Sequence, residues 1–253
     1  MDRHRDAAEL LLSARRDPTQ PLLAFPAVLA PKTPEQAVLI QREVMAALGR
    51  IGGWKVGSPA PDGPCNCSPI PLTAIRASVA KMGAEPLPAP ASYVEAEIAV
   101  LLRHGLPARE VPYTRDEVLA AVAGAHPAIE VLHSRFVDPD AVDPLSNLAD
   151  SLGNAAFVHG PAAPGWREVD LAAEEVVLTV NGAEAKRGRG NPAGDMVRLL
   201  VWLANEGARW AGGLEAGQWI TTGSWTGKDR VPPGGRAEAR FGRIGSAVVT
   251  FPV

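Results

Sequence analysis

The fold of this chain is decided by one apolar stretch, Tyr-Val-Glu-Ala-Glu-Ile-Ala-Val-Leu-Leu, at residues 93–102. Its content of Val, Ile and Leu predicts a buried β-strand. Because side chains alternate between the two faces of a strand, Glu95 and Glu97 must project from the same face. The opposite face carries Ala96, Ile98, Val100 and Leu102. Two neighbouring carboxylates on an apolar strand repel each other and are costly to bury.

This acidic pair has two explanations. The first is the solvated face of an edge strand, where a Glu-x-Glu pattern is common. The second is a site for a divalent cation, which would offset the repulsion between Glu95 and Glu97. Glu130, in a second apolar segment at 127–132, would supply a third oxygen ligand. Carboxylate oxygens suit Mg²⁺ and Mn²⁺, so Glu95, Glu97 and Glu130 form a candidate metal site with open positions for a substrate.

Composition restricts the class of protein. The 253 residues are 46% hydrophobic and 21% charged, as expected for a globular protein of one large domain. A net charge of -3 argues against a nucleic-acid or anionic-membrane surface, and no run approaches the ~18 apolar residues of a membrane span. Cys65 and Cys67 are too close for an unstrained disulfide and are expected to be free thiols in a loop. The charged start, residues 1–6, is unlike a signal peptide, so a cytoplasmic location is expected.

The chain changes character near residue 50. Residues 4–17 and 34–48 predict helices, the second opened by a capping box at Thr33. We therefore expect a helical N-terminal extension, 1–50, and a β-rich catalytic body, 51–253, in one structural unit of the α+β class. Segment 58–92 is expected to be a long loop with a short helix. The expected strands are 53–57, 95–102, 127–133, 155–159, 175–180, 218–223 and 247–252, and the expected internal helices are 118–124 and 194–207.

Two further segments could carry chemistry. Lys55 lies between Trp54 and Val56, and burial together with a nearby cation would lower its pKa. It could then be a general acid or base, or an electrostatic anchor for a substrate anion. The alternative is an ordinary surface lysine. Residues 221–227, Thr-Thr-Gly-Ser-Trp-Thr-Gly, could hold a carboxylate through hydroxyl and amide groups, or could be a plain turn. The sequence has neither a zinc-protease His-Glu-x-x-His motif nor a Gly-x-Ser-x-Gly elbow.

Polar residues also follow Glu130. His133 could lie behind the metal ligands and support them, and Arg135 could bind a substrate acid or a structural carboxylate. Asp150 belongs to the polar segment 148–154, which is either a loop of the site or the capped start of a helix. These two explanations for the segment stay open at the level of the sequence.

In their order along the chain, these blocks resemble the fumarylacetoacetate hydrolase superfamily, in its 2-keto-4-pentenoate hydratase and 4-oxalocrotonate decarboxylase branch. The resemblance covers about residues 35–253, and the six-block order is more specific than any single block. The matching blocks are Gly-Trp-Lys-Val-Gly (53–57), Val-Glu-Ala-Glu-Ile-Ala (94–99), Ala-Ile-Glu-Val-Leu-His-Ser-Arg-Phe (128–136), and the segments 148–154, 190–205 and 214–227.

The resemblance implies a mixed, rolled β-sheet body of the fumarylacetoacetate hydrolase C-terminal type, with helices packed outside. It implies Mg²⁺ or Mn²⁺ bound by Glu95, Glu97 and Glu130. It also implies a catalytic role for Lys55 and substrate contacts from the 221–227 loop, here Gly223, Ser224 and Thr226. A homo-oligomer, and a complex with another enzyme of the same pathway, are further expectations.

The chain departs from this branch in three places. Residues 71–82 contain no Asp or Glu, where hydratases of this kind carry an acidic pair. His133 stands where the branch has Asp, and the run at 149–154 differs from the usual Ala-Asp-Asn-Ala-Ser. The resemblance thus predicts an intact metal site with an altered apparatus for proton transfer.

The expected activity is hydration of a short 2-oxo acid, most like 2-oxopent-4-enoate in the breakdown of aromatic compounds. Decarboxylation of a 2-oxo-3-enedioate and hydrolysis of an acylpyruvate use the same stabilised enolate and are alternatives. A family member without turnover, which binds 2-oxo acids or stabilises a partner enzyme, is a third hypothesis.

Overall fold

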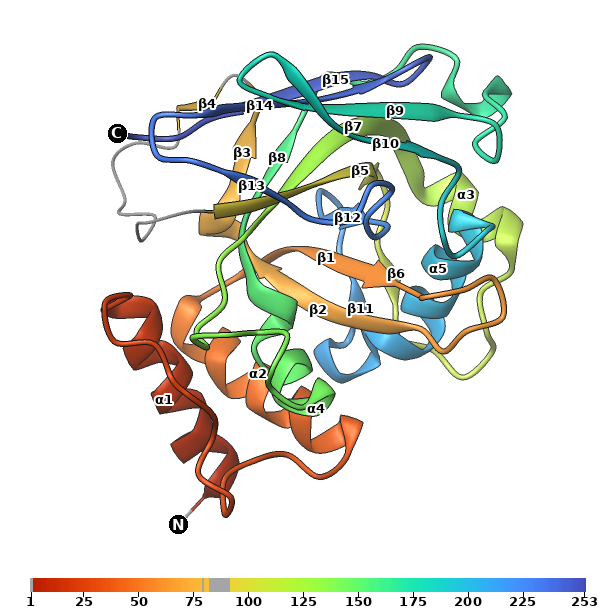
Figure 1. Cartoon of the computed structure of the whole chain (residues 1–253). Coiled ribbons are helices and arrows are strands. Elements are labelled where there is room, and N and C mark those ends of the chain that lie inside the picture. The colour runs from red at the N-terminus through yellow and green to blue at the C-terminus, as the bar shows by residue number, and fades with distance from the viewer. Residues whose placement is uncertain (1, 79, 82–91) are drawn as a thin grey trace.

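The computed structural model of the chain describes residues 2–78, 80–81 and 92–253 and contains two packed β-sheets with helices around them (Figure 1). No helix in this described part is long and apolar enough to cross a membrane. The α-helices are α1 (Arg3–Arg16), α2 (Pro34–Leu48), α3 (Arg115–Ala121), α4 (Pro144–Ala149) and α5 (Met196–Trp202). Short 3-10 or π turns are η1 (Leu72–Ala74), η2 (Ser151–Gly153), η3 (Trp166–Glu168), η4 (Leu203–Gly207) and η5 (Arg209–Ala211).

The main sheet is mixed, as predicted. Its strand order is β2-β1-β12-β5-β7-β8-β3, and β13 also pairs with β5. The β1–β12 and β3–β8 pairs are parallel, whereas the others are antiparallel. Its strands are β1 (Ile51–Gly57), β2 (Asn66–Pro71), β3 (Ile75–Ala77), β5 (Ser92–Leu102), β7 (Val122–Leu132), β8 (Asn154–His159), β12 (Trp219–Thr221) and β13 (Asp229–Val231).

A second sheet covers one face of the first. In the order β10-β9-β14-β15-β4, it packs on β5, β7 and β8, at the top of Figure 1. Its strands are β4 (Ala80–Lys81), β9 (Glu175–Val180), β10 (Ala183–Arg189), β14 (Arg236–Phe241) and β15 (Gly245–Thr250). A small third sheet pairs β6 (Leu106–Pro107) with β11 (Gly213–Leu214).

Side chains along β5 alternate between the hydrophobic core and the opposite face of the main sheet, as expected. The even-numbered side chains, among them Ile98 and Val100, are buried in the core that also contains Val176 and Leu178 of the second sheet. The odd-numbered side chains face the other way, with Glu97 near the middle of the strand and Ala99 in a smaller apolar cluster. One strand therefore contributes to a hydrophobic core on one face and to a polar site on the other.

The N-terminal helices have an apolar cluster of their own. Leu11 of α1 and Ile40 of α2 pack with Phe136 and Ala149 of the body. The helices begin at side-chain caps, Asp2 for α1 and Thr33 for α2, as the capping box at Thr33 predicts. The division of the chain at residue 50 into an extension and a catalytic body stays a prediction.

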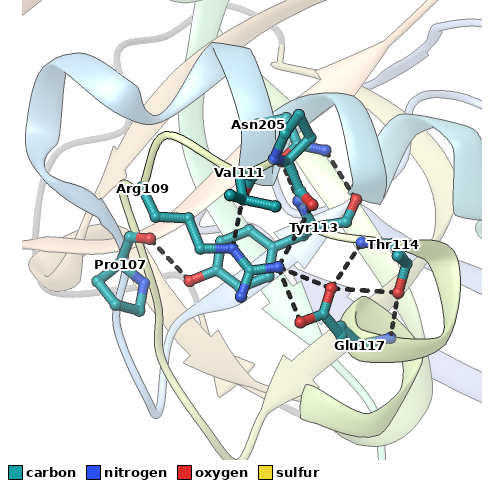
Figure 2. A network of polar contacts seen from close by, with 8 residues as sticks. Pro107, Arg109, Val111, Tyr113, Thr114, Glu117 and Asn205 are labelled. Carbon is teal, nitrogen blue, oxygen red and sulfur yellow. Dashed lines mark hydrogen bonds and ion pairs between the residues drawn. The ribbon is translucent and has the colours of Figure 1, made fainter.

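Figure 2 shows the polar network that fixes the start of α3. The Glu117 carboxylate accepts a hydrogen bond from the Thr114 backbone N–H at 2.8 Å, and the Thr114 hydroxyl accepts one from the Glu117 N–H at 3.3 Å, which together form a capping box. The Arg109 guanidinium also donates to Glu117, at 2.7 Å. Asn205 accepts from the Tyr113 N–H at 2.7 Å and donates to its carbonyl at 3.0 Å. Because Asn205 belongs to η4, the network ties the loop before α3 to the end of α5.

The prediction for segment 58–92 is partly wrong. Residues 58–65 form a loop and η1 is a short 3-10 helix, as expected, but β2, β3 and β4 occupy other parts of 66–81, and residues 79 and 82–91 lie outside the described part. Pro69 and Pro71 hid β2, yet the strand tolerates them because it lies at the edge of the sheet. The charged strands β10 and β14 were also missed, and the helix expected over 194–207 is α5 followed by the π turn η4.

Core packing around β5 gives a prediction about stability. Ile98 is fully buried, so Ile98→Ala should lower the free energy of unfolding by about 2–5 kcal/mol. Val111 is 72% exposed, and Val111→Ala should change it by no more than about 0.5 kcal/mol. Urea unfolding of both variants measures the difference, and an equal effect of the two substitutions would contradict this account of the core.

Candidate functional site

Three carboxylates meet where β5 pairs with β7. Glu95 lies directly opposite Glu130 in the antiparallel register, and Glu97 follows on the same face of β5. One carboxylate oxygen from each residue lies within 4.8 Å of the others. Glu97 and Glu130 are fully buried, whereas Glu95 is partly exposed. The structure thus brings together the three residues that the sequence analysis proposed as metal ligands.

The hydrogen bonds around these carboxylates leave some oxygens free. Glu97 Oε2 accepts from the Gly223 N–H at 3.1 Å and from the Thr221 hydroxyl. Glu130 Oε1 accepts from Lys55 Nζ at 2.6 Å and from Asn154 Nδ2 at 2.7 Å. Glu97 Oε1 and Glu130 Oε2 are buried without a partner among the described residues.

Such orphaned acceptors are rare in proteins, and a cation satisfies them. Hard divalent cations bind several carboxylate oxygens at once. A cluster with two free buried oxygens and a third carboxylate beside them therefore fits Mg²⁺ or Mn²⁺.

The pKa values of the clustered carboxylates also favour the binding of a cation. Burial, followed by repulsion from Glu130, raises the pKa of Glu95 to about 7. The same two causes, with Glu95 added, raise the pKa of Glu97 well above its ordinary value. Burial alone would lower the pKa of Lys55, but attraction from Glu130, Glu95 and Glu97 outweighs it and raises this pKa. The lowering expected from burial is thus outweighed by the carboxylates that surround the ammonium, and the further lowering expected from a nearby cation stays a prediction.

A cavity of about 570 Å³ opens over the cluster. Lys55 and the three carboxylates line it, so both the lysine and the candidate ligands can meet a small molecule there. Lys55 is brought into place by β1, which lies two strands away from β5 with β12 between them. Close packing of these strands needs small residues: a Cβ on Gly53 would lie 2.6 Å from the Trp219 carbonyl oxygen.

The loop after β12 contributes backbone and hydroxyl groups. Gly223 has a φ of +81°, a conformation that favours glycine, and this turn directs its N–H at Glu97. Ser224 also lines the cavity, and its buried Oγ has no partner among the described residues. Thr226 does not line the cavity; its hydroxyl accepts a hydrogen bond from the Ala96 N–H at 3.3 Å. The geometry thus supports substrate contacts from Gly223 and Ser224 and a structural role for Thr226.

Arg135 does not reach the cavity. Only 4% of it is exposed, and its guanidinium is held in an ion pair with Asp150 and by hydrogen bonds to the His133 and Asn154 carbonyl oxygens. Of the two explanations given above, the geometry favours the structural carboxylate, Asp150, over a substrate acid. This buried pair fixes the chain on either side of the site.

His133 itself lines the cavity. Burial and the nearby charge of Arg135 lower its pKa to about 4, so the ring is neutral at neutral pH. The segment 148–154 contains the end of α4 and the short 3-10 turn η2, whose start has no side-chain cap, so the expected capped helix start is wrong. Leu152, with a φ of 53°, lines the cavity, and Asn154 bonds Glu130. This segment is therefore a loop of the site.

Several residues of the site were missed by sequence reasoning. Thr221 and Asn154 hold the carboxylates from outside the cavity lining, and they belong to segments 221–227 and 148–154, which the sequence analysis considered as parts of the site without naming these two residues. Asp140, Lys228 and Arg230 line the cavity from surface loops and a short strand, where no local pattern distinguishes them. Residues 71–78 belong to the segment 71–82, in which the resemblance leads us to expect an acidic pair, and they contribute nothing to the cavity lining.

The sequence of this chain is similar to a known protein family and to individual hydratases. The model of the fumarylacetoacetate (FAA) hydrolase C-terminal family matches residues 53–251. A 2-keto-4-pentenoate hydratase of Burkholderia vietnamiensis is 32% identical over 208 residues, covering 80% of this chain and 78% of that protein. A 2-keto-4-pentenoate hydratase of Paraburkholderia phymatum is 31% identical, covering 84% and 82%.

Solved structures agree on the fold. The 4-oxalocrotonate decarboxylase from Pseudomonas putida G7, complexed with magnesium and adipate, superposes with a TM-score of 0.78 at 23% identity, covering 98% of this chain and 97% of that one. The fumarylpyruvate hydrolase from Pseudomonas aeruginosa, in complex with Mn²⁺ and pyruvate, gives 0.56 at 17% identity, covering 79% and 88%.

The carboxylate cluster predicts where a cation binds. Glu97→Gln should abolish saturable Mn²⁺ binding, because it removes one anionic ligand and places a buried amide against Glu130 and Glu95. Glu206 is exposed and outside the cavity, so Glu206→Gln should bind as the unaltered protein does. Isothermal calorimetry measures both, and unchanged binding in Glu97→Gln would rule out this site.

The raised pKa values predict how cation binding depends on pH. Protons compete with the cation for Glu95, whose pKa is about 7, and for Glu97, whose pKa is also raised. Mn²⁺ affinity should therefore rise steeply from pH 6 to pH 8, with release of protons on binding. Calorimetry in two buffers of different ionisation enthalpy measures the proton release, and a pH-independent affinity would contradict the prediction.

Proposed function

This chain belongs to the fumarylacetoacetate hydrolase family, and on that basis we propose that it is a divalent-metal-dependent lyase acting on a short 2-oxo acid. The activity we favour is that of a hydratase, most like 2-oxopent-4-enoate hydratase. One observation carries the proposal: Glu97 and Glu130 each have a buried carboxylate oxygen without a partner among the described residues, and both residues line a cavity together with Lys55. The hydratase relatives, at 31–32% identity over most of the chain, support the same activity.

The cofactor in this proposal is Mg²⁺ or Mn²⁺, held by Glu95, Glu97 and Glu130. When bound, the cation supplies Lewis acidity that stabilises negative charge on the oxygens of a 2-oxo acid. The Gly223 amide and the Thr221 hydroxyl keep Glu97 in position, and Asn154 does the same for Glu130. These contacts allow the three carboxylates to stay close together in the absence of substrate.

Lys55 is the proposed acid. Its ammonium has three N–H groups, and Glu130 Oε1 takes one of them at 2.6 Å. The others are free to donate a proton to a carbon of the substrate, and the neutral amine that results can take the proton back from the next dienol. Ser224, whose Oγ is unpartnered in the described part of the chain, is placed to donate to the substrate carboxylate.

His133 is the proposed acceptor of a proton from water. It lines the cavity as a neutral imidazole, because burial and Arg135 hold its pKa near 4. This role would replace the acidic pair that the related hydratases carry in the segment corresponding to 71–82. A base that can activate water favours hydration over reactions that need no water.

Decarboxylation of a 2-oxo-3-enedioate is the second candidate. It is supported by the lack of any carboxylate from 71–78 in the cavity lining, since loss of CO₂ requires no activated water. Incubation with 2-hydroxypenta-2,4-dienoate and with 2-oxohex-3-enedioate, followed by assay of CO₂ and of the hydroxylated keto acid, separates the two. Cleavage of an acylpyruvate would indicate the hydrolase instead. Cation and oxalate binding without turnover of any of these substrates would indicate a non-catalytic family member.

We also propose a cytoplasmic homo-oligomer that works in the breakdown of aromatic compounds, in complex with another enzyme of the same pathway. Two free cysteines, Cys65 and Cys67, are typical of a reducing compartment. Closed homo-oligomers are the commonest assemblies, and exposed apolar side chains such as Leu23 and Val28 offer surface for one.

The assignment of Lys55 predicts a separation between catalysis and cation binding. Lys55→Met should lower kcat about 10²- to 10⁴-fold while Mn²⁺ binding persists, because the lysine moves protons and is no ligand. Lys186 is exposed on β10, so Lys186→Met should leave kcat unchanged. Steady-state kinetics and calorimetry measure the two properties, and a Lys55→Met variant with full kcat would remove Lys55 from the mechanism.

A further inference from the structure

Arg230 lies on the same face of the main sheet as the carboxylate cluster. It belongs to β13, which pairs with the start of β5 so that Arg230 is directly opposite Tyr93. Residues opposite each other in an antiparallel pair project to the same side, and Tyr93, Glu95 and Glu97 alternate along one face of β5. Arg230 therefore lies one pleat beyond Glu95 on the acidic face, and it lines the same cavity.

The spacing along β5 matches the length of a small acid. Strand residues rise about 3.4 Å each, so the Cα atoms of Tyr93 and Glu95 are about 7 Å apart. The terminal carboxyl carbons of a six-carbon diacid are about 6 Å apart when the chain is extended. A substrate with one end at Glu95, Glu97 and Lys55 can thus place a group at its other end near Arg230.

We call the end of the cavity that is lined by Asp140, Lys228 and Arg230 its mouth. The charges there favour an anionic group at the far end of the substrate. Lys228 forms an ion pair with Asp140, at 2.7 and 2.8 Å, and both line the cavity. The Arg230 guanidinium makes no hydrogen bond or ion pair to a described residue, whereas its backbone N–H donates to Asp229 Oδ1 at 2.7 Å. One positive charge therefore remains uncompensated at the mouth among the described residues.

The walls of the cavity suit the carbon chain of such an acid. Leu132, Phe136 and Val137 line it together with the charged groups at its two ends. Apolar walls with a few placed polar groups are the usual construction of a small-molecule site.

From this arrangement we infer that Arg230 binds a second carboxylate of the substrate. The reaction type stays the one proposed above, but the site prefers a 2-oxo acid with a carboxylate at its far end to a monocarboxylate such as 2-oxopent-4-enoate. Arg230 is thus the residue that distinguishes dicarboxylic from monocarboxylic substrates. The inference rests on the proposed function, because the cluster at Glu95, Glu97 and Glu130 must hold the 2-oxo acid end. Guanidinium and carboxylate form strong, charge-assisted hydrogen bonds, which gives this contact its selectivity.

The test compares two saturated, unreactive acids of equal length, 2-oxohexanoate and 2-oxohexanedioate, which differ only in the far group. Calorimetry on the Mn²⁺-loaded protein should give about 10- to 100-fold tighter binding of the dicarboxylate. Arg230→Gln should remove this preference while 2-oxohexanoate binds as before. Arg240, which is exposed on β14 and outside the cavity, provides the control, and Arg240→Gln should retain the preference.

The outcomes separate this inference from the proposed function. Equal binding of the two acids to the unaltered protein, or a preference that survives Arg230→Gln, would overturn the role of Arg230 and leave the 2-oxo acid site intact. Failure of both acids to bind would overturn the proposed function, and this inference with it.

A substitution at Asp140 should change the affinity for the dicarboxylate in the direction opposite to Arg230→Gln. Asp140→Asn removes the anion that pairs with Lys228 at the mouth, so it should tighten binding of 2-oxohexanedioate several-fold and leave 2-oxohexanoate unchanged. Weaker binding of the dicarboxylate in this variant would contradict an anion site at the mouth.

Discussion

The burial of three carboxylates side by side is the constraint on which the rest of the structure depends. Glu95, Glu97 and Glu130 meet only because β5 and β7 pair in one register, with Glu95 opposite Glu130. A shift of one residue would turn the acidic side chains of one strand into the hydrophobic core. The apolar face of β5, packed under the second sheet, opposes that shift. Hydrophobic packing on one face of β5 thus stabilises a register that holds the repelling carboxylates together on the other face.

Most of the residues around the cluster reduce that repulsion. Lys55 supplies a positive charge from β1. Thr221 donates a hydrogen bond from the end of β12, Gly223 from the loop after it, and Asn154 from the start of β8. These donors satisfy one oxygen each of Glu97 and Glu130 and leave the other. Incomplete satisfaction of a buried polar group is costly, and it persists in proteins chiefly where a ligand completes it.

The floor of the cavity, formed by Lys55, Glu95, Glu97 and Glu130, differs from the mouth in the elements that carry its side chains. The floor comes from central strands of the sheet, which hold its side chains rigidly. The mouth comes from loops and the short strand β13, where Asp140, Lys228 and Arg230 lie. A rigid floor with variable loops lets one fold serve several related reactions. Under the proposed function, the floor would determine the type of chemistry and the mouth would determine which acid binds.

Predictions from the sequence were correct where a short-range pattern, such as strand alternation or a capping box, determines the structure. Strand alternation by itself placed Glu95 and Glu97 on one face, and the capping box at Thr33 marked the start of α2 correctly. It failed where local signals were absent or misleading. Proline hid the edge strand β2, and charged residues hid β10 and β14. Arg135 follows Glu130 closely in sequence, yet β7 ends at Leu132 and the guanidinium turns to Asp150.

The sequence by itself determined the family, the three carboxylates and the apolar strand that carries two of them, because these features depend on residue identity and on a period of two. Only the tertiary structure decided which carboxylate oxygens stay free, that Lys55 bonds Glu130 across 75 positions of sequence, and that Arg230 shares the acidic face. Such pairings depend on strand register and loop packing, which join residues far apart in the chain. No local pattern encodes them, since each is set by the packing of the whole molecule.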